Sequence, residues 1–594
     1  MHFLMSVLRL NFLALFVCSG LAQALDLSPP DVWSRIVALP TDTKYGVEAS
    51  WPNRREAALQ KKLFNEYGER LSAGDNDWVC EFPARAHIVA RVLGQDPNAL
   101  LAKCGELQEF LARVPFDKLS FVFASEQLNA PASIMGHSFL KMEGLNEEAE
   151  SVSYAISFFT NISTFNLPGL LTSILFTGRD GHVALGPYEQ MIVDYVDVGE
   201  RSIWEVEIEM TAKSRLLTQL HIWELRQAAP EYLFVSFNCA TFLDRLLAIA
   251  SSDGYEPAQR FVTPLDLFKK ASAISRQQTK VVPSRDWVFR SLGGSLEVPA
   301  SDIEKALTRD GAPNLYREFS ATELVIAQAL NEDLFSTHKI TQVRALENHR
   351  GLERALLLKN VNSSEYWLQN HKTPLNVKPD SQAFSSLEKF GEEERLKIGY
   401  LPAARQFMDN RDAYFAQQEN VLAQLTVSVD MQDDDVRLEE FVVLSLKSVV
   451  PKQKYSDAFS FKFDFSARRF VDETLQRPLS ANLSGAYGVG FSLSPDVTAY
   501  GFLGGGVRSN KSHNTWAFGE VEAGLLVKQV FATRGALVFT RTYPDTQERN
   551  GVSELKYDFQ VDLAPSSALW MTAGSRKSSQ REEEFFELGI KRFF

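Results

Sequence analysis

The sequence predicts a multidomain α+β protein. A unit carrying a cysteine and a histidine lies between helical segments and precedes a C-terminal antiparallel β-barrel. The 594 residues leave room for roughly three to four domains. Apolar spacing changes from helical to strand-like and back along the chain. From about residue 391, strand-length runs alternate with turn residues until the chain ends.

Residues 1–24 have the pattern of a secretory signal peptide. Arg9 supplies a positive charge, Leu10 to Val17 is apolar, and Ala22-Gln23-Ala24 forms a small-x-small cleavage site. An uncleaved membrane anchor is the alternative. We expect export across the inner membrane, to the periplasm or the outer membrane.

Residues 25–112 are expected to form a helical N-terminal domain, because the apolar side chains recur at a spacing near 3.6. Cleavage of the signal leaves three cysteines. In an oxidising compartment Cys80 and Cys104 can form a disulfide, which leaves Cys239 unpaired. A buried, inert Cys239 is the alternative to a reactive one.

Residues 113–265 are predicted to form a compact α+β unit. Strands are expected at Lys118–Ala124, Ser138–Met142 and Ser151–Phe159, and a helix is expected to open near Cys239. Residues 266–390 return to helical periodicity and are interpreted as a connector.

Residues 391–594 are predicted to form a transmembrane barrel. Ten runs of about ten residues alternate in polarity and are separated by turns. The last run carries Phe586, Leu588, Ile590 and Phe594 on one side, although Arg592 interrupts that side. A soluble periplasmic β-sandwich is the alternative.

The segments around His137 and Cys239 point to thiol chemistry. Asn238 can cap a helix whose first turn holds Cys239, and a helix N-terminus favours a thiolate by up to about 1 kcal/mol. That is too little for reactivity at neutral pH, so an imidazole has to contribute. His137 is the candidate base and His182 its rival. Residues 151–161 offer groups to orient the ring, namely Ser153, Tyr154, Ser157 and Asn161.

Other chemistries find little support. The net charge of 62 − 75 = −13 argues against nucleic acid as a partner. HExxH, paired CxxC and GxSxG motifs are missing from the sequence. No metal and no cofactor is expected.

The two segments Ser133 to Leu140 and Asn238 to Thr241 resemble the periplasmic domain of Lnb, a bacterial lipoprotein N-acyltransferase family. That family is related to permuted papain-like folds, including lecithin retinol acyltransferase. The resemblance covers roughly residues 113–255. It implies a papain-like Cys-His domain in which Cys239 forms a thioester and His137 moves the proton. Asn238, Ser133, Ser153 and Tyr154 are the expected supporting residues.

We therefore expect an envelope acyltransferase or acyl hydrolase. Its substrate would be a phospholipid or lipoprotein, and its barrel would lie in the bacterial outer membrane. A cysteine amidase or peptidase acting on peptidoglycan or peptides is one alternative. A non-catalytic outer-membrane binding protein is the other. The apolar segment Ile162 to Phe176 could admit acyl chains or pack in the core.

Overall fold

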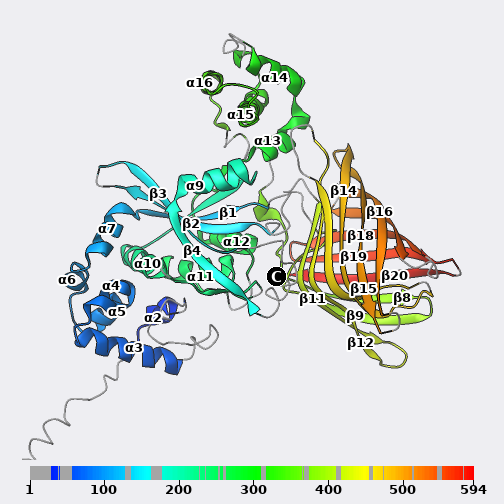
Figure 1. Ribbon diagram of the computed structural model, residues 1–594, viewed down its shortest axis with the longest axis horizontal. Coiled ribbons are helices and arrows are strands. Elements are labelled where there is room, and N and C mark those ends of the chain that lie inside the picture. Colours follow the sequence, from blue (N-terminus) through cyan, green and yellow to red (C-terminus); the bar gives the residue numbers. More distant parts are fainter. Residues whose placement is uncertain are drawn as a thin grey trace, which may run out of the picture.

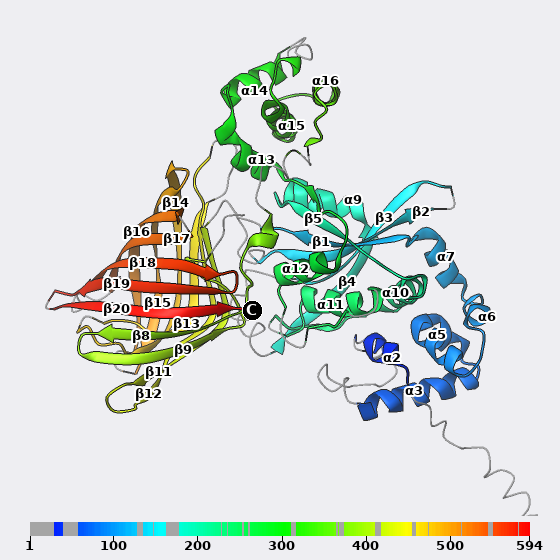
Figure 2. The ribbon, with the colours of Figure 1, turned by 180° about the vertical axis from the view of Figure 1, so that it is seen from behind.

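The computed structural model has a mixed helical and sheet region beside a large barrel (Figures 1 and 2). It describes residues 29–37, 39, 57–126, 135–146, 148–161, 177–226, 228–234, 236–251, 255–258, 262–309, 316–363, 366, 373–409, 417–453, 459–472, 474–511, 514–530, 532–544, 551–579 and 581–594. The expected signal peptide, Ser133 and the apolar segment 162–176 lie outside these residues.

Helices form the described N-terminal part of the chain: α2 (Asp31–Ile36), α3 (Ala57–Ser72), α4 (Asn76–Glu81), α5 (Pro83–Val92), α6 (Pro97–Leu101) and α7 (Gly105–Arg113). Their apolar faces share one core with the sheet region that follows. Short helices need defined ends, and Asp75 caps α4 by accepting the Trp78 N–H. A disulfide joins Cys80 in α4 to Cys104, the residue before α7.

A seven-stranded antiparallel sheet follows, with strand order β6-β4-β3-β2-β1-β5-β7. Its strands are β1 (Lys118–Ala124), β2 (His137–Leu145), β3 (Ser151–Thr160), β4 (Arg179–Pro187), β5 (Ile203–Ile208), β6 (Glu231–Tyr232) and β7 (Lys280–Val282). Ala124 pairs with His137 across β1 and β2, and Phe139 pairs with Ser157 across β2 and β3. These two pairs set the register of the candidate site.

Helices cover both faces of this sheet. α10 (Ala212–Leu225), α11 (Cys239–Ala250) and α12 (Pro264–Ile274) pack on the face that carries Phe121 and Leu140. α9 (Tyr188–Ile192) and the π-helix η5 (Val193–Val198) cover the other face, against Phe139. Alternation along β2 therefore sends Ser138 towards α11 and Phe139 towards η5.

A helical projection connects the sheet region to the barrel (Figure 1). It contains α13 (Arg285–Leu292), η6 (Gly293–Ser295), α14 (Ala300–Thr308), α15 (Ala321–Ser336) and α16 (Gln342–Leu358), and a short 3-10 turn, η8 (Pro374–Asn376), follows it. Within the part of the chain that the structure describes, no helix is long and apolar enough to cross a membrane.

Twelve strands close into an antiparallel barrel. They are β8 (Gln382–Phe390), β9 (Glu393–Leu401), β11 (Gln417–Asp430), β12 (Val436–Val449), β13 (Ser460–Arg469), β14 (Leu479–Ser494), β15 (Val497–Asn510), β16 (Asn514–Val530), β17 (Thr533–Pro544), β18 (Val552–Ala564), β19 (Ser567–Lys577) and β20 (Glu582–Phe593). Pairing of β20 with β8 and of β11 with β9 completes the ring. The short β10 (Ala403–Arg405) adds to β11. Closure excludes the β-sandwich alternative.

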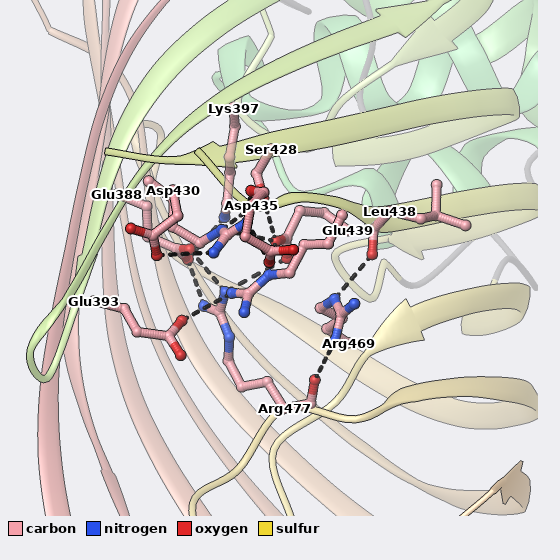
Figure 3. A network of polar contacts seen from close by, with 12 residues as sticks. Glu388, Glu393, Lys397, Ser428, Asp430, Asp435, Leu438, Glu439, Arg469 and Arg477 are labelled. Atoms are coloured by element: carbon pink, nitrogen blue, oxygen red, sulfur yellow. Dashed lines mark hydrogen bonds and ion pairs between the residues drawn. The ribbon is translucent and has the colours of Figure 1, made fainter. Parts of the chain in front are cut away.

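The barrel is apolar outside and charged inside. Tyr487, Leu503 and Val521 form one cross-strand row on the outer wall and are 73%, 71% and 38% exposed. Inside, Arg477 pairs with Glu388 and Glu439, and Lys397 pairs with Glu388 (Figure 3). This inversion of the usual polarity suits a wall that contacts lipid.

Candidate active site

Cys239 opens α11, as the sequence predicts. Asn238 is the N-cap, and its side-chain oxygen accepts the Thr241 N–H at 2.9 Å. Asn238 also donates to the Val262 carbonyl at 3.3 Å, which fixes the cap to a neighbouring segment. The first N–H groups of a helix have no intrahelical acceptor. Here the Ala240 N–H bonds to the Cys239 sulfur, and the Cys239 N–H bonds to the Tyr232 hydroxyl.

The sulfur is enclosed. Cys239 is 4% exposed, and it is the free cysteine of the described residues. Burial raises the pKa of the Cys239 thiol above its ordinary value. Hydrogen bonds from the Ser138 N–H, the Tyr232 hydroxyl and the Ala240 N–H act against that rise, as does the charge of Arg201. The resting side chain is therefore a thiol and not the thiolate that we expected.

His137 begins β2 and makes one side-chain hydrogen bond, between its Nε2 and Ser157 Oγ at 2.9 Å. Its ring stacks on Tyr195, with the centroids 5.8 Å apart and the planes 10° apart. Burial, and then the charge of Arg201, lower the pKa of His137 to about 3. The imidazole is thus neutral at physiological pH, and Nδ1 is the nitrogen left for proton transfer.

The thiol lies beside the main chain that follows His137, and the imidazole itself stacks on Tyr195. The Cys239 sulfur accepts from the Ser138 N–H, and that amide is joined directly to His137. Between these two side chains, both of them described, the structure contains no hydrogen bond. Catalytic hydrogen bonds are often long before substrate binds, so this geometry is compatible with proton transfer in a complex.

Three residues of the site were not predicted as site residues. Tyr195 lies in η5, Arg201 lies in the turn between η5 and β5, and Tyr232 lies in β6. Arg201 lies over the Tyr195 ring at 4.8 Å. The sequence carries no sign that Tyr232 bonds to the sulfur or that the charge of Arg201 acts on it.

The other expected residues lie elsewhere. Ser153 donates to Glu189 at an exposed position, and Tyr154 packs against the main core. His182 is exposed on β4, where Asn161 is 3.5 Å from its Nε2. Of the four groups proposed to orient the imidazole, Ser157 is the one that contacts His137.

The site borders the outer wall of the barrel. Met135, two residues before His137, packs against Leu446 and Phe461. Phe234, two residues after Tyr232, packs with Met135 against a patch that includes Leu422. Both residues flank the site and contact wall positions of β11, β12 and β13, on the side of the barrel nearest the sheet region (Figure 2).

The described residues contain no cluster of three or more histidine, cysteine or acidic side chains that could hold a metal. The groups around the sulfur are an imidazole, two phenols, a guanidinium and backbone amides. These groups can move a proton and stabilise an oxyanion.

Comparison with known proteins agrees with the two-part architecture. Residues 379–593 match a family model described as a domain of unknown function, DUF7840. No curated protein matches the chain.

Solved outer-membrane proteins match about a third of this chain. One is an outer membrane channel of Pseudomonas putida F1, with 11% identity, 37% of this chain and 96% of that chain covered, and a TM-score of 0.26. A loop-deletion variant of OmpT of Vibrio cholerae has 7% identity and a TM-score of 0.20, and the match covers 36% of this chain and 97% of that chain. The KdgM porin has 8% identity and a TM-score of 0.22, and the match covers 36% of this chain and 99% of that chain. Such low scores support no argument, so the assignment of the barrel rests on its closure and polarity.

The region that contains Cys239 and His137 has its own match. A family model described as the Lnb N-terminal periplasmic domain matches residues 106–272, which include the sheet and the helices α10 and α11. This chain is therefore an envelope protein in which a region that matches the Lnb N-terminal periplasmic domain precedes a closed barrel of outer-membrane type.

Proposed function

We propose that this protein is a thiol-dependent acyltransferase or acyl hydrolase. It would use Cys239 and His137 in a permuted papain-like arrangement on a phospholipid or lipoprotein. The observation that carries the proposal is the set of groups around the Cys239 sulfur. A helix N-terminus, the Ser138 amide and the Tyr232 hydroxyl converge on it, beside an imidazole positioned by Ser157.

The proposed reaction passes through a thioester. His137 Nδ1 takes the Cys239 proton, and the sulfur bonds to an ester carbonyl carbon of the lipid. The negative charge that develops on the carbonyl oxygen is stabilised by the N–H groups of Cys239 and Ala240. The carbon–oxygen bond then breaks, and the leaving lysolipid oxygen takes the proton from His137. An amine or water then bonds to the thioester carbonyl carbon while His137 accepts its proton. The carbon–sulfur bond breaks, and that proton returns to the sulfur.

The neighbouring barrel wall supports a lipid substrate. Met135 and Phe234 contact apolar wall positions at the edge of the region that lipid would surround. An acyl ester of the inner leaflet would therefore need to move only a short way to reach the sulfur. A soluble peptide or muropeptide would gain nothing from this placement, which is why the lipid substrate is preferred to the amidase alternative.

Mass spectrometry of Cys239 tests the proposal. The full-length protein in detergent micelles would be incubated with an isotope-labelled phospholipid, and the peptide that contains Cys239 would then be analysed. We expect a labelled acyl adduct that hydroxylamine removes from the wild type and that does not form in Cys239→Ala. His137→Ala should slow its formation by about 100-fold or more, whereas His182→Ala, on an exposed neighbouring strand, should not.

Two outcomes would overturn the proposal. The first is a folded wild-type protein that acquires no adduct on Cys239 but cleaves muropeptides, which would establish the amidase alternative. The second is full cellular function of the Cys239→Ala variant, which would establish a non-catalytic role.

A further inference from the structure

We infer that Arg201, and not a protonated His137, is the cation that stabilises the Cys239 thiolate. This inference rests on the proposed function, because it names the group that makes the same thiol ionisable. Arg201 acts through space on the sulfur and is a positioning residue. His137 then remains a neutral base throughout the resting state.

The guanidinium of Arg201 is fixed beside the site. Its Nε donates to the Ser125 carbonyl at 2.5 Å, and its Nη2 donates to the Ala124 carbonyl at 3.1 Å. Ala124 is the register partner of His137, so these bonds place the charge at the strand ends where the imidazole stands. Arg201 is 4% exposed, and solvent therefore screens its charge poorly.

Tyr195 separates the guanidinium from the imidazole. Its ring stacks on His137, and Arg201 lies over the same ring at 4.8 Å. The arrangement keeps Arg201 near the sulfur while an aromatic face, and not a hydrogen bond, meets His137. The titratable groups around the guanidinium are Tyr195, Glu126, His137 and Cys239, with Tyr232 on the far side of the sulfur.

One fixed cation has opposite effects on the two reacting groups. The charge of Arg201 lowers the pKa of the Cys239 thiol, which favours the thiolate. The same charge lowers the pKa of His137, which disfavours the imidazolium. Burial lowers the pKa of Arg201 to about 10, so that the guanidinium is still protonated at neutral pH. A resting thiolate–imidazolium pair would require the opposite effect at His137, so the imidazolium of the proposed reaction forms only during proton transfer.

The pH dependence of Cys239 alkylation tests this assignment. Iodoacetamide labelling of the full-length protein would be followed between pH 5 and pH 11 for the wild type, Arg201→Lys, Arg201→Met and His137→Ala. Arg215→Met is the matched control, since Arg215 lies on α10 and pairs with Asp117. We expect Arg201→Met to raise the alkylation midpoint by about one pH unit, a tenfold slower reaction near neutral pH. The alkylation midpoint should stay unchanged in the other three variants, Arg201→Lys, His137→Ala and Arg215→Met.

A raised midpoint in His137→Ala would overturn the inference, and this measurement does not depend on whether Arg201→Met folds. An unchanged midpoint in a folded Arg201→Met protein would overturn it as well. The outcome is distinct from that of the proposed function. If Cys239 acquires an acyl adduct but Arg201→Met does not shift the alkylation midpoint, only the role of Arg201 is rejected. If Arg201→Met shifts the midpoint but no adduct forms, only the proposed acyl chemistry is rejected.

A different observation, in the barrel, carries a second inference: the geometry points to a lumen that is plugged at its periplasmic end and does not conduct. Phe407 leaves the wall after β10 and packs inside the barrel. Its partners belong to β12, β15, β16 and β17, and they are Val449, Tyr500, Phe502, Leu526, Ala536 and Val538.

Polar contacts fix the same segment to the opposite wall. Lys591 of β20 donates to Gln406 at 2.7 Å and to Asp409 at 3.1 Å. Gln382 of β8 donates to Asp409 at 2.6 Å. Residues 406–409 thus contact strands on both sides of the lumen, which places them across it.

The lumen beyond this plug is a cavity of about 550 Å³ with charged walls. At the other end, Arg477 follows β13 and bonds to Glu388 of β8 at 2.8 and 2.9 Å (Figure 3). This contact draws the connection between β13 and β14 over the lumen and narrows the outer opening. The plug and the narrowing restrict the lumen at both of its ends.

Planar bilayer recordings test this inference. The wild-type protein should show no stepwise conductance, whereas the combined Phe407→Gly, Met408→Gly and Arg477→Ala variant should conduct. Arg541→Ala, on the exposed outer wall near the same rim, is the control and should remain silent. Conductance by the wild type would overturn the inference. So would a folded, membrane-inserted combined variant that stays silent.

Discussion

Ser157 Oγ lies 2.9 Å from His137 Nε2, across the pair of strands that carry the candidate base. The two residues are diagonal neighbours, because Ser157 pairs in register with Phe139. When Nε2 carries the proton and donates it to Ser157, Nδ1 is unprotonated and can accept from Cys239. Ser157 therefore supports the base without touching the reacting sulfur.

Removing this hydroxyl should slow thiol acylation modestly. A neutral hydrogen bond contributes about 0.5–1.5 kcal/mol, so Ser157→Ala should reduce the rate of adduct formation on Cys239 by roughly 2- to 12-fold. Ser153→Ala is the matched control, because Ser153 lies on the same strand and bonds to Glu189 instead. A rate loss of equal size in both variants would show that the effect comes from the strand and not from the imidazole.

Much of the fold could be predicted from sequence because its strands are long and patterned. The range Lys118–Ala124 is β1, and the range Val436–Val449 is β12. The strands β8 and β9 were not predicted, and the barrel begins at Gln382, before the expected boundary at 391. The side chains of β8 and β9 that point into the barrel, such as Glu388 and Lys397, are charged. The sequence of this segment is therefore as polar as that of a connector between domains.

The candidate site was predicted in part. Cys239, Asn238 and His137 fall in local motifs that indicate a helix start and a strand start, and the structure has both. Tertiary packing alone brings the Tyr232 hydroxyl to the sulfur and the charge of Arg201 near it, and no local sequence pattern reports such packing. The expected ionised sulfur was wrong for the resting protein, because the depth at which α11 buries Cys239 depends on the whole core.

The joint between the sheet region and the barrel should lose stability as pH rises. Asp266 of α12 accepts the Asp380 N–H, and Asp380 forms an ion pair with Arg405. Burial and the charge of Asp380 raise the pKa of Asp266 to about 6. The folded state thus holds the Asp266 proton more tightly than the unfolded chain, and stability falls between about pH 4 and pH 6, by at most about 3 kcal/mol.

Asp266→Asn should remove that pH dependence, because asparagine stays neutral and can still accept from the Asp380 N–H. The measurement is the melting temperature of the full-length protein at pH 4.5 and pH 7.5. We expect the advantage of Asp266→Asn over the wild type to be larger at pH 7.5. Asp302→Asn, at an exposed position paired with Lys305, should show no such change, and a constant difference between Asp266→Asn and the wild type would contradict the prediction.

Loss of the disulfide should destabilise the N-terminal helices without affecting the barrel. The bond joins residues 24 apart, and closing a loop of that length stabilises the folded state by about 3 kcal/mol in the chain-entropy model. We expect Cys80→Ser with Cys104→Ser to lower the first melting transition by several degrees. The barrel should remain folded on heating as in the wild type, which gel electrophoresis of heated samples measures. Unchanged melting of both parts would show that the helices are held by packing alone.

A positive charge on the outer barrel wall should prevent stable membrane insertion. Leu503 lies in the middle of β15, where it pairs in register with Tyr487 and Val521. The three side chains form an exposed apolar row on the outer wall of the barrel. Arginine at the bilayer midplane of a barrel costs about 2–4 kcal/mol. Leu503→Arg should therefore fold into phosphatidylcholine vesicles with lower stability in urea titrations. Leu346→Arg, at an exposed apolar position on α16, should fold like the wild type, since that helix lies outside the barrel. Equal loss in both variants would mean that the row at Leu503 does not meet lipid, and the membrane assignment of the wall would fail.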